Sequence, residues 1–257
     1  MIEWITESPS VAVLRLHRPE ARNALTWAGM DMFARAVERA AGSDHLRALI
    51  ITGAGEAFCS GGDLFELHDY LGHGDGVRLA NGMGEALDRL EALPFPTLAA
   101  IEGPALGGGA ELALACDLRI AADGAVLGMM HVRLGITPAW GGGQRLLRLV
   151  GYARAFEWLT TGRVLTADEA YAHGVVNRRT GRGQALDEAR ALAEALTARD
   201  TDTVRAVKRL LRGGLTLPLP DALEAERSEF PDRWASEAHR AASAAFVSRR
   251  EPRPRPT

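Results

Sequence analysis

The sequence predicts an α/β protein whose C-terminal region contains only helices. Two short apolar stretches, residues 47–53 and 97–101, each lead into a glycine-rich loop and then a helical pattern, which is typical of repeated right-handed β/α crossovers. From residue 183 to 246 the apolar positions are spaced three and four apart, which predicts helices alone. We therefore expect an α/β core over residues 1–197 and a helical region over residues 198–257.

The N-terminal elements follow from alternation and capping. Residues 2–6 and 11–16 alternate apolar and polar side chains on either side of a Ser-Pro-Ser turn, which predicts a β-hairpin. Thr26 is a suitable N-cap for a helix that runs to Ala41, and Gly42 is a suitable stop. A helix thus follows the hairpin.

The next strands read as buried on both faces. The run at 47–53 is short, β-branched and continuously apolar, as expected for a strand covered on both sides. A helix around residues 75–93 follows, and Pro94 and Pro96 confine the next strand to residues 97–101. Both glycine-rich loops should emerge on the same side of the layered core. The second half of the chain is predicted to be helical.

Composition and charge narrow the function classes. At 257 residues and 47% hydrophobic content, the chain can bury a sizeable core. A net charge of −3 argues against nucleic-acid binding as the main function. Cys59 and Cys116 are too few for a disulfide framework and lack metal-ligand spacing, which favours free thiols in a reducing compartment. No apolar run approaches the roughly 20 residues of a membrane span and the N-terminus lacks signal-peptide character, so we expect a cytoplasmic protein.

The stretch "ALGGGAELALACD", residues 105–117, places three glycines at the start of a helix. A phosphate-binding loop is one interpretation, but the spelling matches neither G-x-G-x-x-G nor G-x-x-x-x-G-K-[ST]. The glycines could also serve only the close approach of helix and strand. A third interpretation is that Gly108 presents its N–H to a carbonyl oxygen at the positive end of the helix, as half of an oxyanion hole.

Glu111 supports the third interpretation. It lies three residues after Gly108, about one helical turn away and on the same face. Its alternative role is to complement the helix dipole, worth about 0.3–1 kcal/mol. The residues after it, "LALAC", are wholly apolar, so the helix is predicted to be buried, and an unpaired carboxylate there is costly. A buried carboxyl group can take or give protons near neutral pH.

The earlier loop supplies a second donor. In "GAGEAFCSGGDL", residues 53–64, a buried strand leads through Gly61 and Gly62 into a helix that begins near Asp63. The Gly62 N–H could converge with that of Gly108 on one oxygen. Donors of this kind contribute roughly 2.7–4 kcal/mol each to transition-state stabilisation.

At these residues the chain resembles the crotonase superfamily, the enoyl-CoA hydratase/isomerase proteins. The order and spacing of the matching segments make coincidence a poor explanation. They are "RPEARNAL" (18–25), "AFCSGGDL" (57–64), "PTLAAIEGPALGGGAELALACD" (96–117), "LGITPAWGGGQRL" (134–146) and "LTTGRVLTADEAYAHGVVN" (159–177).

The resemblance implies a ββα spiral core that binds acyl-CoA, residues 1–197, and a C-terminal trimerisation region, residues 198–257. It further implies a homotrimer or homohexamer acting on a coenzyme A thioester in fatty-acid metabolism. The thioester oxygen would lie between the N–H groups of Gly62 and Gly108. Coenzyme A would be part of the substrate, and the resemblance implies no separate cofactor and no metal.

The resemblance also suggests where coenzyme A binds. Arg22 and Ala24 match the segment that contacts the nucleotide end, although Arg22 could equally be a solvated surface charge. Ser60 and Gly61 would lie along the pantetheine. Phe246, in "AAFVSRRE", resembles a C-terminal segment that reaches toward the adenine end of the ligand.

Two residues depart from the hydratase pattern. Hydratases of this family use a second glutamate twenty residues after the position of Glu111, and this chain has His131 there. A lone histidine can simply be a satisfied core residue, but an imidazole titrates near neutral pH and can act as acid or base. Trp140 replaces a small residue in the P-x-x-G-G turn, where its indole would fill the core or narrow and dry the pocket.

These features leave several activities open. The leading expectation is reversible hydration of a 2-enoyl-CoA, with Glu111 and His131 moving protons. The combination of His131 and Trp140 is similar to ethylmalonyl-CoA decarboxylase-like members, so decarboxylation of a malonyl-type ester, ethylmalonyl-CoA or methylmalonyl-CoA, is the alternative. Isomerisation of an enoyl-CoA is third. A crotonase-fold binding module without catalysis, including an RNA-binding one, is less favoured because both glycines and Glu111 are present.

Overall fold

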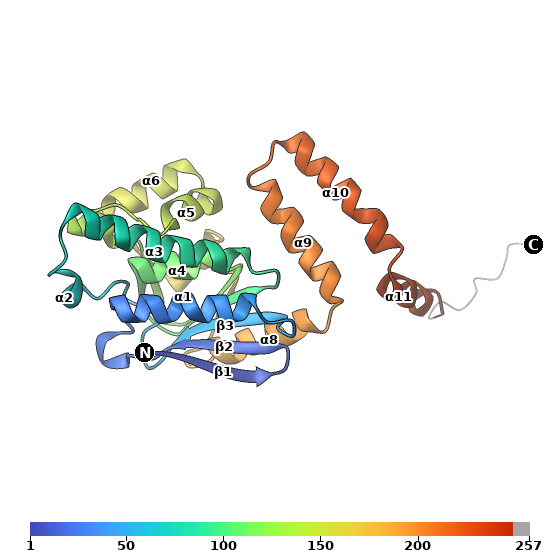
Figure 1. Cartoon of the computed structure of the whole chain (residues 1–257), viewed down its shortest axis with the longest axis horizontal. Coiled ribbons are helices and arrows are strands. Elements are labelled where there is room, and N and C mark those ends of the chain that lie inside the picture. The colour runs from blue at the N-terminus through green and yellow to red at the C-terminus, as the bar shows by residue number, and fades with distance from the viewer. Residues whose placement is uncertain (249–257) are drawn as a thin grey trace, which may run out of the picture. The chain divides into compact units, whose positions relative to one another are not determined.

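The computed structural model describes residues 1–248 and divides into two compact units, Met1–Thr197 and a second unit that begins at Ala198. Figure 1 shows strands and helices in the first unit and helices alone in the second. The α/β class and the helical C-terminal region that the sequence predicts are both confirmed.

A six-stranded sheet forms the centre of the first unit. Its strand order is β1-β2-β3-β4-β6-β9, with β1 and β2 antiparallel as the predicted hairpin and every later pair parallel. The bounds are β1 Ile2–Ser8, β2 Val11–Leu16, β3 Ala48–Gly53, β4 Thr97–Ile101, β6 Leu118–Ala122 and β9 Arg178–Thr180.

A small second sheet has the order β5-β7-β8. Its strands are β5 Ala105–Leu106, β7 Val126–Gly128 and β8 Val164–Thr166. The expectation that the second half of the chain is helical is therefore wrong in part, because β8 and β9 lie there, and β6 and β7 just before it are further strands that were not predicted. β7, β8 and β9 have only three residues each, so too few positions exist to show an alternating pattern.

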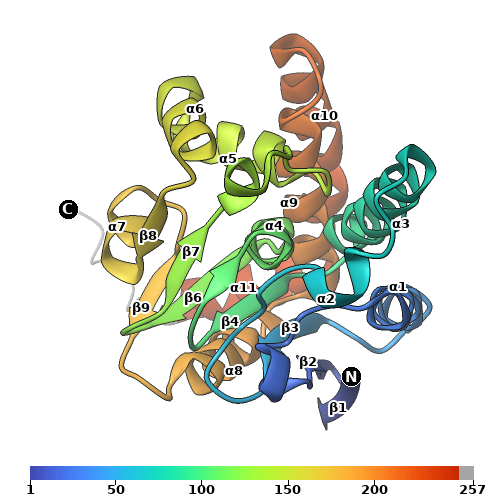
Figure 2. The same cartoon turned by 90° about the vertical axis from the view of Figure 1, so that its left-hand side faces the viewer.

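Helices cover both faces of the six-stranded sheet, as the continuously apolar strands predict. Within β3, Leu49 and Ile51 pack into a large apolar cluster with α1 (Trp27–Ala41), α3 (His73–Ala92) and α4 (Gly108–Ala115). Ala48 and Ile50 alternate with these residues along β3 and pack on the opposite face against α8 (Ala185–Thr197). Figure 2 shows α8 on one face of the sheet and α4 on the other. The other helices of this unit are η1 Pro19–Ala21, α2 Leu64–Leu67, η2 Met130–Leu134, α5 Gly142–Val150, α6 Tyr152–Thr161 and α7 Ala167–Ala172.

All eight residues of α4 are buried, so the backbone ends of this helix need partners inside the protein. At its C-terminal end the buried Arg119 donates to the carbonyl oxygens of Cys116 at 2.6 Å and Ala113 at 3.4 Å, and to that of Val175 at 2.6 Å. Burial lowers the pKa of Arg119 from its ordinary value. The N-terminal end of α4 faces the two glycine-rich turns.

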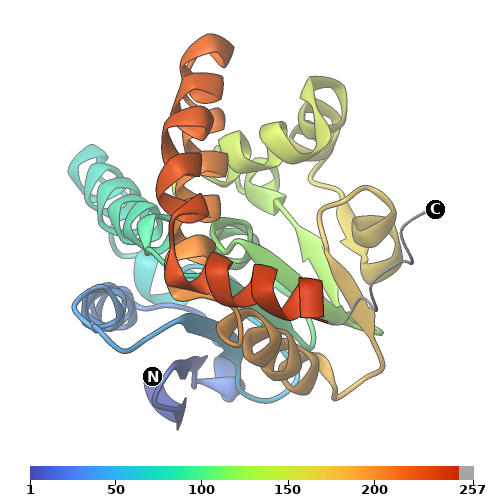
Figure 3. The same cartoon turned by 90° about the vertical axis from the view of Figure 1, so that its right-hand side faces the viewer.

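The second unit consists of α9 (Thr201–Gly214), α10 (Leu219–Trp234) and α11 (Glu237–Ser248) within the described residues. Figure 3 shows α10 returning alongside α9, and α11 turning away from the end of α10. Glu229 of α10 pairs with Arg209 of α9 and lies 3.3 Å from Nε of Arg233. Over residues 1–248, no helix combines the length and apolar character that a membrane crossing requires.

Candidate active site

The two glycine-rich turns lie in direct contact. An isolated parallel bridge joins Cys59 to Ala105, and the Leu106 N–H donates to the Cys59 carbonyl at 2.9 Å. A Cβ atom added to Gly61 would stand 2.9 Å from the nitrogen of Gly108, closer than real Cβ contacts allow. Only glycine at position 61 permits this approach, so the close packing of the two turns explains one part of the glycine pattern.

Two backbone N–H groups are left free where these turns meet. Gly108 is the first residue of α4, where an N–H has no partner within the helix. Neither it nor the N–H of Gly62 donates a hydrogen bond to any other group in residues 1–248. The preceding Gly107 has φ +53° and donates to the Gly128 carbonyl at 2.8 Å, which fixes the turn without using the Gly108 N–H.

Asn23 holds the first turn, a role that sequence reasoning missed. Its side chain is buried, and Nδ2 donates to the carbonyl oxygens of Ala54 at 2.9 Å and Ala57 at 2.7 Å. Its Oδ1 accepts from the Arg18 N–H at 2.9 Å. Both Arg22 and Asn23 have positive φ, +50° and +57°, a conformation that asparagine tolerates better than most residues. The signal for this role in the sequence was an asparagine in the short segment between the hairpin and the first helix.

The residues expected along coenzyme A come together beside this turn. Ser60 N–H donates to the Arg22 carbonyl at 3.1 Å, and Leu25 N–H donates to the Gly61 carbonyl at 2.8 Å. Ala24 is buried, whereas the Arg22 side chain is exposed and makes no ion pair with any other residue in 1–248. A free cation thus lies on the segment that borders the Gly62 turn.

Asp63 fixes the residue that follows Gly62. Its carboxylate accepts from the Phe65 N–H at 3.0 Å, which caps α2, and it also pairs with the Arg18 guanidinium. The Arg18 hydrogen bond is the main cause that lowers the pKa of Asp63 below its ordinary value. The first turn is therefore held on both sides, by Asn23 and by Asp63.

Glu111 lies in the first turn of α4 with 1% of its surface exposed, as the apolar residues after it predict. Its Oε2 accepts from the N–H groups of Trp140 at 2.9 Å and Gly142 at 2.8 Å. Gly142 is the first residue of α5, so this carboxylate occupies the positive end of a second helix as well as its own. A Cβ on Gly142 would stand 2.5 Å from Glu111 Cγ, so glycine is required there.

His131 is the third partner of this carboxylate. Its Nε2 lies 3.0 Å from Glu111 Oε1, and 11% of its side chain is exposed. The other ring nitrogen, Nδ1, is buried and has no hydrogen-bond partner in residues 1–248. The structure thus brings the His131 imidazole and the Glu111 carboxylate into contact.

Trp140 covers Gly108. A Cβ on Gly108 would stand 2.1 Å from Cζ3 and 2.5 Å from Cη2 of the indole, so the ring lies against this glycine. The indole N–H donates to the Leu79 carbonyl on α3 at 3.2 Å. Trp140 belongs to the main apolar cluster and is 4% exposed, so it fills the core and narrows the space beside the Gly108 N–H at once.

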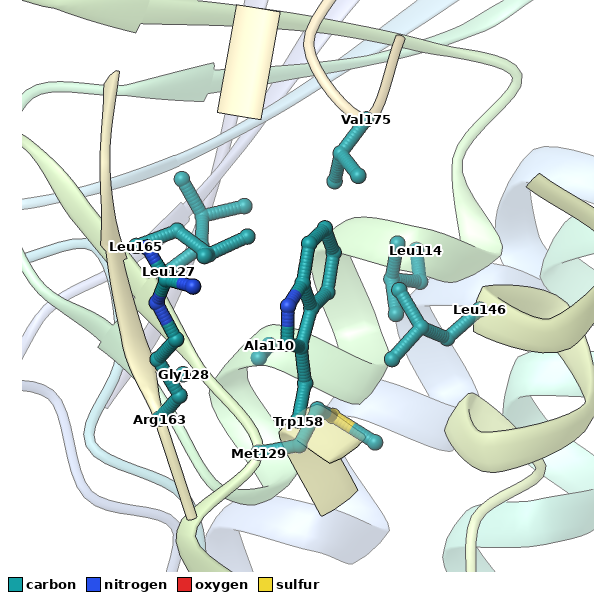
Figure 4. A pocket seen from close by; sticks show the side chains of 10 residues that line it. All are labelled: Ala110, Leu114, Leu127, Gly128, Met129, Leu146, Trp158, Arg163, Leu165 and Val175. Carbon is teal, nitrogen blue, oxygen red and sulfur yellow. The ribbon is translucent and has the colours of Figure 1, made fainter. Parts of the chain in front are cut away.

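A small apolar cavity of about 20 Å³ lies behind α4 and does not correspond to the expected substrate site. Figure 4 shows the Trp158 indole within it, between Leu114 and Leu146 on one side and Leu127 and Leu165 on the other. A volume of this size holds about one water molecule. The cavity is therefore a packing gap in the core and cannot receive an acyl chain.

The remaining predicted contact residue, Phe246, lies on α11 in the second unit, with 61% of its surface exposed. In residues 1–248 no group of three His, Cys, Asp or Glu side chains is placed to hold a metal ion. Cys59 and Cys116 are both buried and neither is in a disulfide, and burial raises the pKa of the Cys59 thiol to about 12. The Cys59 thiol is therefore not a reactive nucleophile at neutral pH.

The arrangement of glycine turns and buried glutamate agrees with a match over nearly the whole chain. Residues 6–254 match the model of the enoyl-CoA hydratase/isomerase family. The chain belongs to this family. Its enzymes form the crotonase superfamily that the sequence resembles, so membership and the acyl-CoA enzyme class are confirmed.

Relatives within the enoyl-CoA hydratase/isomerase family include named hydratases and a decarboxylase. The chain is 35% identical to a short-chain-enoyl-CoA hydratase of Clostridium acetobutylicum, over 94% of this chain and 92% of that protein. It is 33% identical to the ethylmalonyl-CoA decarboxylase of Gallus gallus, over 91% of this chain and 79% of that protein. The crystal structure of an enoyl-CoA hydratase from Bacillus anthracis matches with a TM-score of 0.91 and 33% identity, over 98% of both chains.

Proposed function

We propose that this protein catalyses the reversible hydration of a 2-enoyl-CoA thioester. The observation that carries the proposal is the buried Glu111 carboxylate, which lies one turn after the free Gly108 N–H and has its Oε1 3.0 Å from His131 Nε2. The similarity to enoyl-CoA hydratases over nearly the full chain supports the same activity. Acid–base side chains and backbone amides carry out the chemistry, and coenzyme A is supplied by the substrate.

In this proposal the N–H groups of Gly62 and Gly108 hold the thioester oxygen. The positive end of α4 adds to their effect where negative charge collects on that oxygen. Each donor would contribute roughly 2.7–4 kcal/mol in the transition state. The Asn23 side chain fixes the first turn, and the hydrogen bond from Gly107 to the Gly128 carbonyl fixes the second. Little reorganisation is therefore needed when the substrate binds.

The two proton transfers that hydration requires can be assigned to the Glu111–His131 pair. The water oxygen bonds to Cβ, and its proton passes to the pair. The electrons of the C=C bond move onto the thioester oxygen as an enolate, and the pair returns a proton to Cα as the carbonyl re-forms. Glu111 Oε1 is the basic atom, because Oε2 is occupied by two backbone N–H groups. His131 Nε2 lies 3.0 Å from Oε1, close enough to exchange this proton with it in the proposed reaction.

Decarboxylation of a malonyl-type CoA ester is the second candidate, and two observations favour it. An imidazole stands where hydratases of the family use a second glutamate, and the Trp140 indole lies against Gly108. Loss of CO₂ leaves its bonding electrons in the same enolate, which needs one proton at Cα and no water. An indole that excludes water would also destabilise the departing carboxylate. Enoyl-CoA isomerisation, which shares the enolate, is a third candidate.

Two assays distinguish the candidates. The protein is incubated with crotonyl-CoA, following loss of enoyl absorbance, and separately with ethylmalonyl-CoA and methylmalonyl-CoA, following CO₂ release. Turnover of crotonyl-CoA supports hydration. Turnover of a malonyl-type ester alone would replace hydration by decarboxylation, and binding without turnover of any ester would favour a non-catalytic crotonase-fold module.

We further propose that coenzyme A lies along the Gly62 turn, with Arg22 at a phosphate, Ala24 at the nucleotide end, and Ser60 and Gly61 along the pantetheine. The unpaired Arg22 guanidinium supports this placement. Arg22→Met should raise KM for the CoA ester several-fold and leave kcat unchanged. Phe246 is proposed to contact the adenine end.

The second unit is proposed to form a homotrimer or homohexamer. Its helices expose large apolar side chains. Monomeric proteins seldom expose large contiguous apolar patches. The exposed side chains include Leu211, Leu219, Phe230 and Trp234, each more than half exposed. Light scattering on the purified protein tests this proposal, because a monomeric mass would contradict it. The two buried cysteines, neither of which is in a disulfide, support a reducing, cytoplasmic compartment.

A further inference from the structure

α5 carries a buried cation that the proposed chemistry does not use. Arg145 is 7% exposed and lies on the buried face of α5 with Leu146 and Val150. A cation in such a position is costly unless it is paired and hydrogen-bonded. The partners of Arg145 therefore indicate why a charge stands on an otherwise apolar face.

The partners of Arg145 lie in two directions. Toward α3, its Nη2 donates to Asp88 Oδ1 at 2.8 Å and to Glu91 Oε2 at 2.9 Å, and its Nε donates to Glu91 Oε2 at 3.1 Å. In the other direction, Nη1 donates to the Trp140 carbonyl at 2.7 Å. The planar guanidinium thus bridges two carboxylates on α3 and one backbone carbonyl, a geometry that a lysine ammonium cannot reproduce.

That carbonyl belongs to the turn that holds Glu111. The N–H groups of Trp140 and Gly142 donate to Glu111 Oε2, and Gly141 between them has φ +88°. A Cβ on Gly141 would stand 2.6 Å from Arg145 Nη1, so the guanidinium lies directly against this backbone. The Trp140 indole attaches the same turn to α3 a second time, through the Leu79 carbonyl.

We infer that Arg145 is a positioning residue: by attaching the 140–142 turn to α3, it aims two backbone N–H groups at Oε2 and leaves Oε1 of Glu111 directed to His131. The inference deepens the proposed function and rests on it for the catalytic role of Glu111. The competing interpretation is that Arg145 only joins α3 to α5. That role predicts lower stability, with no link to the chemistry of Glu111.

A double-mutant cycle separates the two interpretations. Arg145→Met should lower kcat by about 10²-fold, the scale of a small misplacement of catalytic groups, and change KM for the CoA ester by less than about threefold. In a Glu111→Gln background the same substitution should lower kcat by less than about threefold, because the group it positions is already gone. Equal losses in both backgrounds would overturn the inference. Arg148→Met, at an exposed position of the same helix, is the matched control and should leave kcat unchanged.

Amide hydrogen exchange tests the inference without turnover. Arg145→Met should accelerate exchange of the Trp140 and Gly142 amides by at least tenfold and leave amides in the middle of α3 protected. Unchanged exchange at both amides would overturn the positioning role even if the protein turned over no ester. Should Arg145→Met fail to fold, the pair Asp88→Asn and Glu91→Gln removes the same anchor from α3, and the same exchange pattern is expected.

Discussion

The imidazole Nε2 of His131 lies 3.0 Å from Oε1 of Glu111, and the other oxygen of that carboxylate is held by two backbone N–H groups. One oxygen is thus a fixed acceptor of two hydrogen bonds, and the other faces the imidazole. In the proposed function, this division within one carboxylate lets the site move protons without a second glutamate.

His131→Ala should lower turnover by about 10²- to 10⁴-fold, the usual contribution of a general acid or base. Binding of the CoA ester should remain within a few-fold, because the predicted coenzyme A contacts lie on other segments. Steady-state kinetics and calorimetric titration measure the two effects. His45→Ala, at an exposed position, is the control. An unchanged rate in His131→Ala would return this residue to a packing role.

Gly108→Ala should destabilise the fold by about 1–3 kcal/mol through overpacking, because the new methyl group would meet the Trp140 ring at 2.1 Å. Thermal or urea unfolding measures the loss. Adding Trp140→Leu should restore most of the stability, since it removes the indole atoms in contact. A double variant no more stable than Gly108→Ala would show that the ring does not cause the clash.

Asn23→Ala should lower the free energy of unfolding by about 1–3 kcal/mol, because the part-buried Ala54 carbonyl and the buried Ala57 carbonyl lose their donor, and alanine is also strained at φ +57°. Asn23→Gly is the matched variant, since glycine accepts this φ and lacks the side chain. Asn23→Gly should recover only the part of the lost unfolding free energy that comes from backbone strain at φ +57°. Full recovery by glycine would mean that the side-chain hydrogen bonds contribute nothing.

Asp63→Asn should destabilise the protein by about 1–3 kcal/mol at pH 7, because it removes the charge paired with Arg18 and keeps the cap of α2. The pKa of Asp63 is lowered in the folded protein. Its contribution is therefore complete above the ordinary carboxyl range and is lost as pH falls through the folded value. Urea unfolding from pH 7 to pH 3 should show the two proteins converging at low pH. A constant difference would contradict the ion-pair assignment.

The parts of the fold that the sequence predicts have local causes. The hairpin, α1 with its Thr26 cap and Gly42 stop, and β3 all follow from patterns within a few residues. All residues of β6 are apolar except the buried Arg119. Carbonyl groups up to 56 positions away accept hydrogen bonds from its guanidinium. Such a strand cannot be found from alternation, because its polar residue is tolerated only through tertiary contacts.

In the candidate site, too, some features could be predicted from the sequence and others could not. Glycine runs and the position of Glu111 could be found in the sequence, because they occur within single segments. The hydrogen bonds of Glu111 to Trp140 and Gly142 join residues about thirty positions apart. The bridge from Arg145 to Asp88 and Glu91 spans more than fifty. Arg145 lies among the buried positions of α5, and a cation at such a position was the one local sign that anions must lie opposite.

Exchange of the α-protons of butyryl-CoA in D₂O tests the central claim most directly, because hydration, decarboxylation and isomerisation all pass through the same thioester enolate. The protein should incorporate deuterium at Cα, as measured by mass spectrometry, and Glu111→Gln should slow incorporation by about 10²-fold or more. An unexchanged ester with the unaltered protein, or an undiminished rate in Glu111→Gln, would contradict the assignment of Glu111 as the base beside the glycine turns.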